Sequence, residues 1–264
     1  MRNNSQLHRM KRRREIVDIV QSVFGANYVP VPAKEDSGSG IPVFEDSRSR
    51  LGWVYVPDGT FVMGLTGDQA EAAVRLAEAP FLTFSEMQPS ATRTVQAMLV
   101  SQSPVSVVAA LEARVPVQGQ IGHDSVALVD FESADEIASH YGASLLNEVE
   151  WEYVCRAGTE SLFWFGDRIP NRTSMERILG LRAPSLPNAF GLIELFHGEW
   201  CADYWAPSLD AAPNRDRGRV IRGGASRFWP WADSREWAAC SSAYRMPASD
   251  TGGLGAAVRL VRRQ

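Results

Sequence analysis

The sequence predicts an α+β fold, and three observations support that class. Before residue 158, apolar residues recur at helical spacing in several segments that begin with capping residues. Short runs rich in β-branched and aromatic residues, typical of strands, stand between those segments. From residue 158 onward, Gly, Pro, Asn and aromatic residues alternate with very short β runs, without long helical periodicity. We therefore expect helices early in the chain, followed by a large irregular part with short strands.

Length and composition are those of an ordinary globular protein. The 264 residues suffice for one large domain or a domain with an appendage, and 45% of them are hydrophobic. No apolar stretch approaches the roughly 20 residues of a membrane span, and no apolar core follows the basic start as in a signal peptide. Cys155, Cys201 and Cys240 are far apart and odd in number, which argues against a disulfide framework. These features predict a cytoplasmic protein without a membrane partner.

The first 51 residues differ from the rest of the chain. Apolar residues from Leu7 to Phe24 recur at helical spacing, which predicts a basic helix within residues 1–25. Its run of basic residues can bind phosphates, but a solvated helix face is favoured, and the formal net charge of −4 does not favour nucleic acid. Residues 26–51 are rich in Pro, Ser, Gly and charge, which predicts a linker or extended arm before a domain over residues 52–264. The helix and linker would attach the domain to a partner or a second subunit.

A hairpin is predicted where the main domain begins. Residues 53–56 and 60–63 are β-rich and flank a Pro-Asp-Gly turn sequence. Farther along, Ser103 with Pro104 gives an N-cap and a proline at the first helical position, which predicts a helix to about Arg114. The same criteria predict a helix over residues 67–78 and strands over residues 94–100 and 125–131.

Two capping boxes predict the next two helices. They are Ser133 with Glu136, before a helix ended by Gly142, and Asn147 with Glu150, before a helix over residues 148–157. Trp151 lies on the apolar face of the second helix and is expected to be a core anchor.

None of the usual catalytic or metal-binding patterns is found. The histidines are His8, His123, His140 and His197, and no two have a spacing that places them on one helix face. His140 is expected to be exposed near a helix end, and a structural hydrogen bond is favoured for His197 over a metal or acid-base role. There is no Cys-x-x-Cys, no Gly-rich phosphate loop and no Gly-x-Ser-x-Gly elbow. Glu148, Glu150 and Glu152 are interpreted as helix-face and capping residues. We therefore predict no catalytic and no metal-ligating residue.

Seven segments, in order along the chain, carry a family resemblance. They are residues 56–64 (VPDGTFVMG), 98–105 (MLVSQSPV), 145–153 (LLNEVEWEY), 187–192 (PNAFGL), 199–203 (EWCAD), 222–226 (RGGAS) and 242–245 (SAYR). With them the chain resembles the formylglycine-generating enzyme, or sulfatase-modifying factor, family from residue 52 almost to its end. The resemblance implies an elaborated C-type-lectin-like α+β domain with low regular secondary structure.

The resemblance also implies which metals to look for. The family's oxidases bind copper through two cysteines shortly after the Gly-Gly element. Here Phe228, Asp233 and Trp237 occupy that region, and Cys240 is the single cysteine nearby. One thiol cannot form a Cu(I) site of two thiolates. Formylglycine generation by the copper mechanism is therefore not expected.

The family's calcium element is shortened in this sequence. Residues 196–200 are two residues shorter than the family pattern and lack its Asn, and calcium needs six or more oxygen ligands. No cofactor is therefore predicted, although the question of a calcium ion stays open. Arg259, in the family's terminal motif, is expected to form a structural ion pair.

Two classes of function remain, and the first is a non-catalytic, lectin-like module. It would bind a protein, peptide or small-molecule ligand through its aromatic, Arg-rich final segment. The predicted ligand-binding residues are Trp229, Trp231, Arg235, Trp237, Tyr244 and Arg245. Because large aromatic residues are usually buried, Trp151 and Trp200 are interpreted as core. For Trp229 and Trp231, core and binding surface are equally open. Retroelement-encoded variable proteins of this fold use the corresponding segment as a diversified binding surface.

The second class is an oxidoreductase that uses non-standard chemistry on the same fold. The sulfoxide synthases related to this family carry an iron-binding helical domain that supplies three histidines. The N-terminal region here carries only His8, which does not favour an independent iron enzyme. A tailoring oxidoreductase of the kind found in siderophore pathways stays open. Metal analysis of the purified protein separates the two classes.

Overall fold

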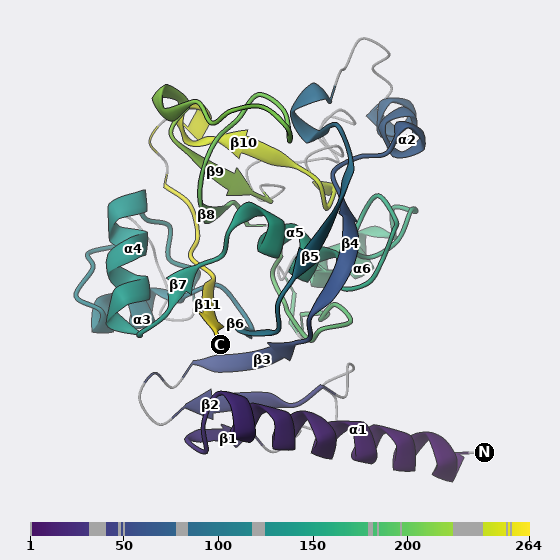
Figure 1. The fold of residues 1–264 in the computed structure, drawn as a ribbon, viewed down its shortest axis with the longest axis vertical. Helices are drawn as coiled ribbons and strands as arrows, with labels where there is room; N and C mark the ends of the chain where they lie inside the picture. The colour runs from purple at the N-terminus through teal and green to yellow at the C-terminus, as the bar shows by residue number, and fades with distance from the viewer. Residues whose placement is uncertain are drawn as a thin grey trace.

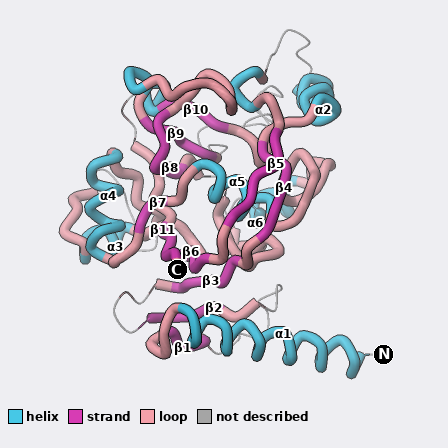
Figure 2. The backbone as a smooth tube through the Cα atoms, in the orientation of Figure 1, coloured by secondary structure: helices cyan, strands magenta, loops and turns pink. Residues whose placement is uncertain are grey.

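A computed structural model describes most of the chain (Figure 1). The residues that it describes are 2–31, 41–46, 49, 51–77, 84–117, 125–178, 182–183, 185–195, 197–223, 240–251, 253 and 255–264. Helices, three sheets and long irregular connections are combined in one structure (Figure 2). The α+β class predicted from the sequence is confirmed.

The main sheet has six strands and joins distant parts of the chain. Its strands, in spatial order, are β1 (Tyr28–Pro30), β2 (Val43–Asp46), β3 (Gly52–Val56), β6 (Met98–Ser101), β11 (Leu260–Arg263) and β7 (Ser144–Leu145). Neighbouring strands are antiparallel throughout. All four residues of β6 are buried, because core clusters cover this strand on both faces.

Two smaller sheets complete the strand structure. One has the order β10 (Arg245–Pro247), β9 (Arg219–Arg222), β8 (Glu199–Tyr204), and the other pairs β4 (Gly59–Met63) with β5 (Ala91–Val95). In Figure 1 the three-stranded sheet lies at the end of the molecule away from the N-terminal helix.

Six α-helices surround these sheets in the described part of the chain. They are α1 (Arg2–Val23), α2 (Gly67–Ala77), α3 (Val107–Glu112), α4 (Phe131–His140), α5 (Glu148–Arg156) and α6 (Arg172–Ile178). Three short 3₁₀ turns, η1 (Ser85–Met87), η2 (Arg215–Arg217) and η5 (Ala248–Thr251), lie in the connections. None of the described helices combines the length and the apolar character that a membrane crossing requires.

Two large apolar clusters pack on opposite sides of the main sheet. Successive residues of a strand point to opposite faces, and accordingly Leu99 belongs to the cluster that contains Ile137 of α4. Its neighbour Val100 belongs to the cluster that contains Trp151 and Val154 of α5. Trp151 is 1% exposed, which confirms its predicted role as a core anchor.

The strongest local signals are confirmed. The predicted N-terminal helix is α1, which packs on the sheet through buried Val20. At the start of α5, the Asn147 side chain accepts from the backbone N–H of Glu150 at 2.8 Å. The Glu150 carboxylate accepts in return from the backbone N–H of Asn147 at 2.8 Å, which completes the capping box.

The predicted hairpin at residues 53–63 is wrong. β3 pairs with β2 and β6, whereas β4 pairs with β5. The chain turns a corner between two sheets, because both edges of β3 already have partners. The single strand predicted over residues 94–100 is likewise divided, since β5 ends at Val95 and β6 begins at Met98 in another sheet.

Three further boundaries need correction. Ser106, not Ser103, caps α3. The N–H of Val105 donates to the carbonyl of Val258, so the chain is still extended at that point and the helix begins later. Asp130, not Ser133, caps α4: its carboxylate accepts from the N–H of Ser133 at 2.8 Å. The strand predicted over residues 125–131 is reduced to isolated bridges followed by the first helical residue.

The predicted linker over residues 26–51 contributes to the main sheet. β1 and β2 lie in it, and Tyr28 and Phe44 are buried in the core. Residues 32–40 of the linker lie outside the described part of the structure.

Candidate functional site

The candidate site is the base of the aromatic segment, which we define as residues 223–244. β9 ends just before this segment and β10 begins just after it, and Arg222 is the direct cross-strand partner of Arg245. The two ends of the segment therefore meet. The predicted ligand-binding residues Trp229, Trp231, Arg235 and Trp237 lie outside the described residues and stay predictions.

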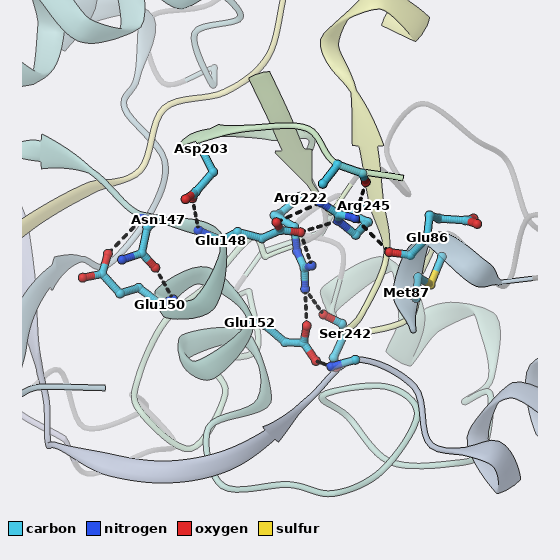
Figure 3. A network of polar contacts seen from close by, with 12 residues as sticks. Glu86, Met87, Asn147, Glu148, Glu150, Glu152, Asp203, Arg222, Ser242 and Arg245 are labelled. Atoms are coloured by element: carbon cyan, nitrogen blue, oxygen red, sulfur yellow. Dashed lines mark hydrogen bonds and ion pairs between the residues drawn. The ribbon is translucent and has the colours of Figure 1, made fainter. Parts of the chain in front are cut away.

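Glu148 joins the two arginines at this base (Figure 3). Its Oε1 accepts from Nη1 of Arg222 at 3.0 Å and also from Nε of Arg245. Its Oε2 accepts from Nη2 of Arg245 at 3.0 Å. Like charges at directly opposed strand positions repel each other. The carboxylate offsets that repulsion, so it holds the ends of the aromatic segment together.

Glu152 extends the contacts along α5. It accepts from Nη2 of Arg222 at 2.5 Å, from Nε of Arg156 at 2.8 Å and from the N–H of Gly64 at 2.8 Å. Residues four apart share one helix face, so Glu148, Glu152 and Arg156 form a row facing the arginine from β9. We call Glu148, Glu152, Arg156, Arg222 and Arg245 the buried arginine network.

Most of the charged groups of the network have several hydrogen bonds, although Nε of Arg222 has no partner among the described residues. Backbone carbonyls of Glu86 and Ala206 accept from Nη1 of Arg245 at 2.9 and 2.7 Å, and that of Ser242 accepts from Nη2 of Arg222 at 3.1 Å. Such bonds are needed because a buried charge without partners is strongly unfavourable. The network therefore ties η1, β9, β10 and the residues just after β8 to α5.

The sequence interpretation of Glu148 and Glu152 as helix-face residues needs correction. Glu150 does cap the helix, but the other two are buried and pair with arginines. Glu152 lies four residues before Arg156, a spacing that indicates an ion pair on α5. The partners from β9 and β10 carried no such local signal, since they lie 70 or more residues away in sequence.

Arg245 and Tyr244 are the two predicted ligand-binding residues that the structure describes. Arg245 is 3% exposed, and its guanidinium points to the network and to backbone carbonyls. Tyr244 is half-buried and packs against two apolar clusters. This placement favours a supporting role for both, and direct ligand contact by either stays a prediction.

Gly223 opens the aromatic segment in a left-handed conformation with φ of 69°. A Cβ atom here would lie 2.5 Å from the carbonyl oxygen of His197, so only glycine fits. The backbone therefore makes a close approach at this first glycine of the Gly-Gly pair. Gly224 lies outside the described residues.

His197 lies beside this glycine and is half-buried. Burial, and then the nearby charge of Arg259, lower the pKa of its imidazole to about 4. The ring is therefore neutral at pH 7.

The cysteines do not fit the two-thiolate copper site that the family resemblance implies. Cys155 and Cys201 are buried. Burial raises the pKa of Cys155 to about 12 and raises that of Cys201 well above its usual range. Metals bind the thiolate form. Cys240, at the end of the aromatic segment, is half-buried and is the third cysteine of the chain.

The oxygen atoms near the shortened calcium element do not fit a calcium ion either. The Glu199 carboxylate accepts from Nη2 of Arg259 at 2.8 Å and from Nε1 of Trp151 at 2.7 Å. The guanidinium of Arg259 also donates to the backbone carbonyls of Ser101, Gln102, Ile193 and Glu194. These oxygens are already used, and the predicted ion pair of Arg259 is confirmed. Among the described residues, no group of three or more His, Cys, Asp or Glu could hold a metal.

A cavity of about 490 Å³ opens beside the network. β4, α2 and the C-terminal end of α5 surround it, and Phe61, Tyr153 and Arg156 are among its lining residues. Leu162 also lines it and accepts through its carbonyl from the N–H of Ser242 at 3.0 Å. The cavity is therefore next to the C-terminal end of the aromatic segment.

Solved structures with this fold include the following two. PvdO from Pseudomonas aeruginosa matches with a TM-score of 0.60 and 20% identity, over 84% of this chain and 98% of its own. Treponema denticola variable protein 1 matches with a TM-score of 0.54 and 15% identity, over 81% of this chain and 95% of its own. Likenesses at these identities show the fold alone. No curated protein sequence matches the chain.

The family model for the sulfatase-modifying factor enzyme 1-like domain matches residues 42–253. The match includes β2, all of α5 and both strands that carry Arg222 and Arg245. The chain therefore belongs to the family of proteins with a sulfatase-modifying factor enzyme 1-like domain.

Proposed function

We propose that the chain is a non-catalytic binding module of this family. The aromatic segment contacts a protein, peptide or small-molecule ligand, and Trp229, Trp231, Arg235 and Trp237 supply the contact surface. The observation that carries this proposal is the pairing of Arg222 with Arg245 through buried Glu148 at the base of the segment.

A fixed base favours binding for a thermodynamic reason. Ordering a loop on association costs free energy, and a scaffold that already fixes the loop ends reduces that cost. The network fixes both ends against α5, which is itself anchored in the core by Trp151. Aromatic side chains presented from such a base are suited to act as binding hot spots.

The cavity supports the same proposal. Its volume of about 490 Å³ is in the usual range for small-ligand pockets. It lies next to residues 240–244, so a ligand held by the aromatic segment would have room for a side group there.

The chemistry of the thiols supports binding over copper catalysis. Two of the three cysteines are buried with raised pKa values, so the chain offers at most Cys240 as an accessible thiolate. An oxidoreductase with non-standard chemistry is the competing function, and it would require another redox group.

The first experiment replaces Trp229 and Trp231 with Ala. Immobilised wild-type protein and the double variant are compared for retained partners from a lysate and for bound small molecules by mass spectrometry. Truncation of two hot-spot tryptophans is expected to weaken retention of a specific ligand by about tenfold or more. A matched control is the double variant Val29→Ala/Leu111→Ala, which truncates two exposed apolar side chains elsewhere. It should retain the ligand normally.

Thermal unfolding of the same variants decides whether the tryptophans are core. A midpoint close to that of the wild type assigns them to the surface, whereas unfolding of the Trp229→Ala/Trp231→Ala protein assigns them to the core and refutes the proposal. Metal analysis of the purified protein, with titration of free thiols, tests the competing function. Stoichiometric copper or iron would overturn the binding module.

A further inference from the structure

A second group of arginines lies at the other end of β9 and is arranged very differently. The guanidinium carbon of Arg219 lies 3.8 Å from the ring centroid of Tyr204 and 4.3 Å from that of Phe131. The guanidinium carbon of Arg215 lies 4.3 Å from the same Tyr204 centroid. We call Phe131, Tyr204, Arg215 and Arg219 the arginine–aromatic cluster.

Regular structure holds the rings of this cluster in place. Tyr204 at the end of β8 is the cross-strand partner of Arg219 at the start of β9. Phe131, the first residue of α4, packs edge-on against Trp200 with ring centroids 5.7 Å apart. Trp200 is fixed in turn by a 2.8 Å hydrogen bond from its Nε1 to the carbonyl of Val129. The rings therefore form a stable support for the two guanidinium groups.

The two arginines have no ion pair within the described structure. Arg219 donates from Nη1 to the carbonyl of Ala202, and Arg215, which is exposed, makes no side-chain hydrogen bond to a described residue. Neither has a carboxylate within ion-pair distance among those residues, in contrast to Arg222 and Arg245 in the network. Two positive charges are thus left without a neutralising group on one surface of a chain whose net charge is −4.

Guanidinium groups that lie over aromatic rings are oriented before a ligand arrives. Ring contact leaves the edge of the planar group available, and that edge carries the paired N–H donors that match a carboxylate. Each exposed ion pair contributes little alone. A ligand with several carboxylates, spaced along a chain, gains from both arginines together.

From this arrangement we infer that the arginine–aromatic cluster binds the carboxylates of an acidic peptide segment in a partner protein. A nucleic acid fits less well, because its continuous phosphate chain needs an extended basic surface, whereas the cluster supplies two arginines that are flanked in sequence by exposed Asp203 and Asp216. The cluster shares no residue with the ligand-binding set proposed for the aromatic segment. This inference therefore stands or falls independently of the proposed function.

The test measures fluorescence anisotropy of a fluorescein-labelled peptide of alternating Glu and Ser, added to the full chain. A twin peptide with Gln in place of every Glu, and a labelled poly-uridine oligonucleotide, are measured in parallel. The acidic peptide should bind, with an affinity that falls as salt is raised, and the Gln peptide should not. The double variant Arg215→Gln/Arg219→Gln should weaken binding of the acidic peptide by about tenfold or more.

Two further variants make the result specific. Arg168→Gln removes the same charge from another exposed arginine that has no aromatic partner among the described residues, and it should leave the affinity unchanged. Tyr204→Leu keeps both arginines but removes their common ring, and it should weaken binding of the acidic peptide if orientation matters. Thermal midpoints of all variants confirm that they are folded.

Several outcomes would overturn the inference. Equal binding of the acidic and Gln peptides would show that carboxylates are not recognised. Equal weakening by Arg168→Gln would reduce the effect to net charge. Tighter binding of the oligonucleotide than of the acidic peptide would assign the surface to nucleic acid instead.

Discussion

Arg222 and Arg219 lie at the two ends of β9, a strand of four residues, and their guanidinium groups have opposite surroundings. Arg222 is fully buried and contacts two carboxylates and a backbone carbonyl. Arg219 is half-exposed, lies over two aromatic rings and has no carboxylate partner among the described residues. The same side chain type thus stabilises the fold at one end and offers free donors at the other.

Tyr204, the last residue of the neighbouring strand β8, and Trp205, the residue after it, show the same division. Tyr204 supports the two exposed arginines, whereas the ring of Trp205 lies 5.3 Å from the guanidinium carbon of Arg217 and 5.9 Å from that of Arg245. Successive residues along an extended chain face opposite sides. Tyr204 therefore contacts the arginine–aromatic cluster, whereas the adjacent Trp205 contacts Arg245 of the buried arginine network. Burial and available counter-charges, more than residue type, decide what an arginine does here.

The largest expected loss of folding free energy comes from Arg222→Gln, at the buried end of β9. Glu148 keeps Arg245 and Glu152 keeps Arg156, but the shared partner of both carboxylates is removed. Removal of one member of a buried ion-pair group typically costs about 3–5 kcal/mol of folding free energy. Urea unfolding followed by circular dichroism measures the loss. Arg168→Gln, which removes an exposed charge, is the control. A change below about 1 kcal/mol, the size expected for an exposed pair, would contradict the assignment of this arginine as a structural centre.

A smaller loss of unfolding free energy is expected at acidic pH, and it should arise from His197 beside the buried end of β9. The pKa of His197 is lowered to about 4 in the folded protein, from an ordinary value near 6.5. The unfolded chain therefore binds a proton before the folded protein does. The neutral imidazole contributes fully to the free energy of unfolding above about pH 6.5. This contribution is lost as the pH falls toward about 4, by at most about 1.4 kcal/mol per pH unit.

Comparison of the wild type with His197→Gln isolates this proton from the titration of carboxylates. The difference in unfolding free energy between the two proteins should shrink as the pH falls through this window. A difference that stays constant from pH 7 to pH 4 would show that the imidazole is protonated equally in both states.

The smallest effect on stability is expected at the exposed end, from Arg219→Gln. This substitution removes two ring interactions at a half-exposed position and one hydrogen bond to a backbone carbonyl. Exposed cation–ring interactions contribute about 0.5–1 kcal/mol, so the free energy of urea unfolding should change by no more than that. A loss as large as that of Arg222→Gln would remove the distinction between the two ends of β9.

Local signals in the sequence predicted local structure well. The Asn147–Glu150 capping box needs only one helical turn, and the structure contains it with both hydrogen bonds. A Gly-Gly pair is an equally local signal, and Gly223 adopts the left-handed conformation that only glycine tolerates easily. The family resemblance, carried by several such segments, predicted the fold.

Partners far apart in sequence could not be predicted in the same way. The strand at residues 52–56 has a good turn after it, yet it pairs with β2 and β6, because their burial outweighs the local turn preference. Glu148 has the composition of a solvated helix residue, and only the fold brings Arg222 and Arg245 to it. The tryptophans of the aromatic segment were predicted from residue type alone, and their role awaits the binding and unfolding experiments.

The contacts of Arg259 also determine the order in which the domain can be assembled. Its guanidinium joins backbone carbonyls at residues 101–102 and 193–194 to the carboxylate of Glu199, and the residues just after it form β11 between β6 and β7. A ribosome makes this part of the chain after all of those partners. Until then β6 and β7 have open edges, which are prone to wrong pairing. The main sheet is therefore completed only after β11 has been made, and the nascent domain depends on protection of these edges until β11 joins β6 to β7.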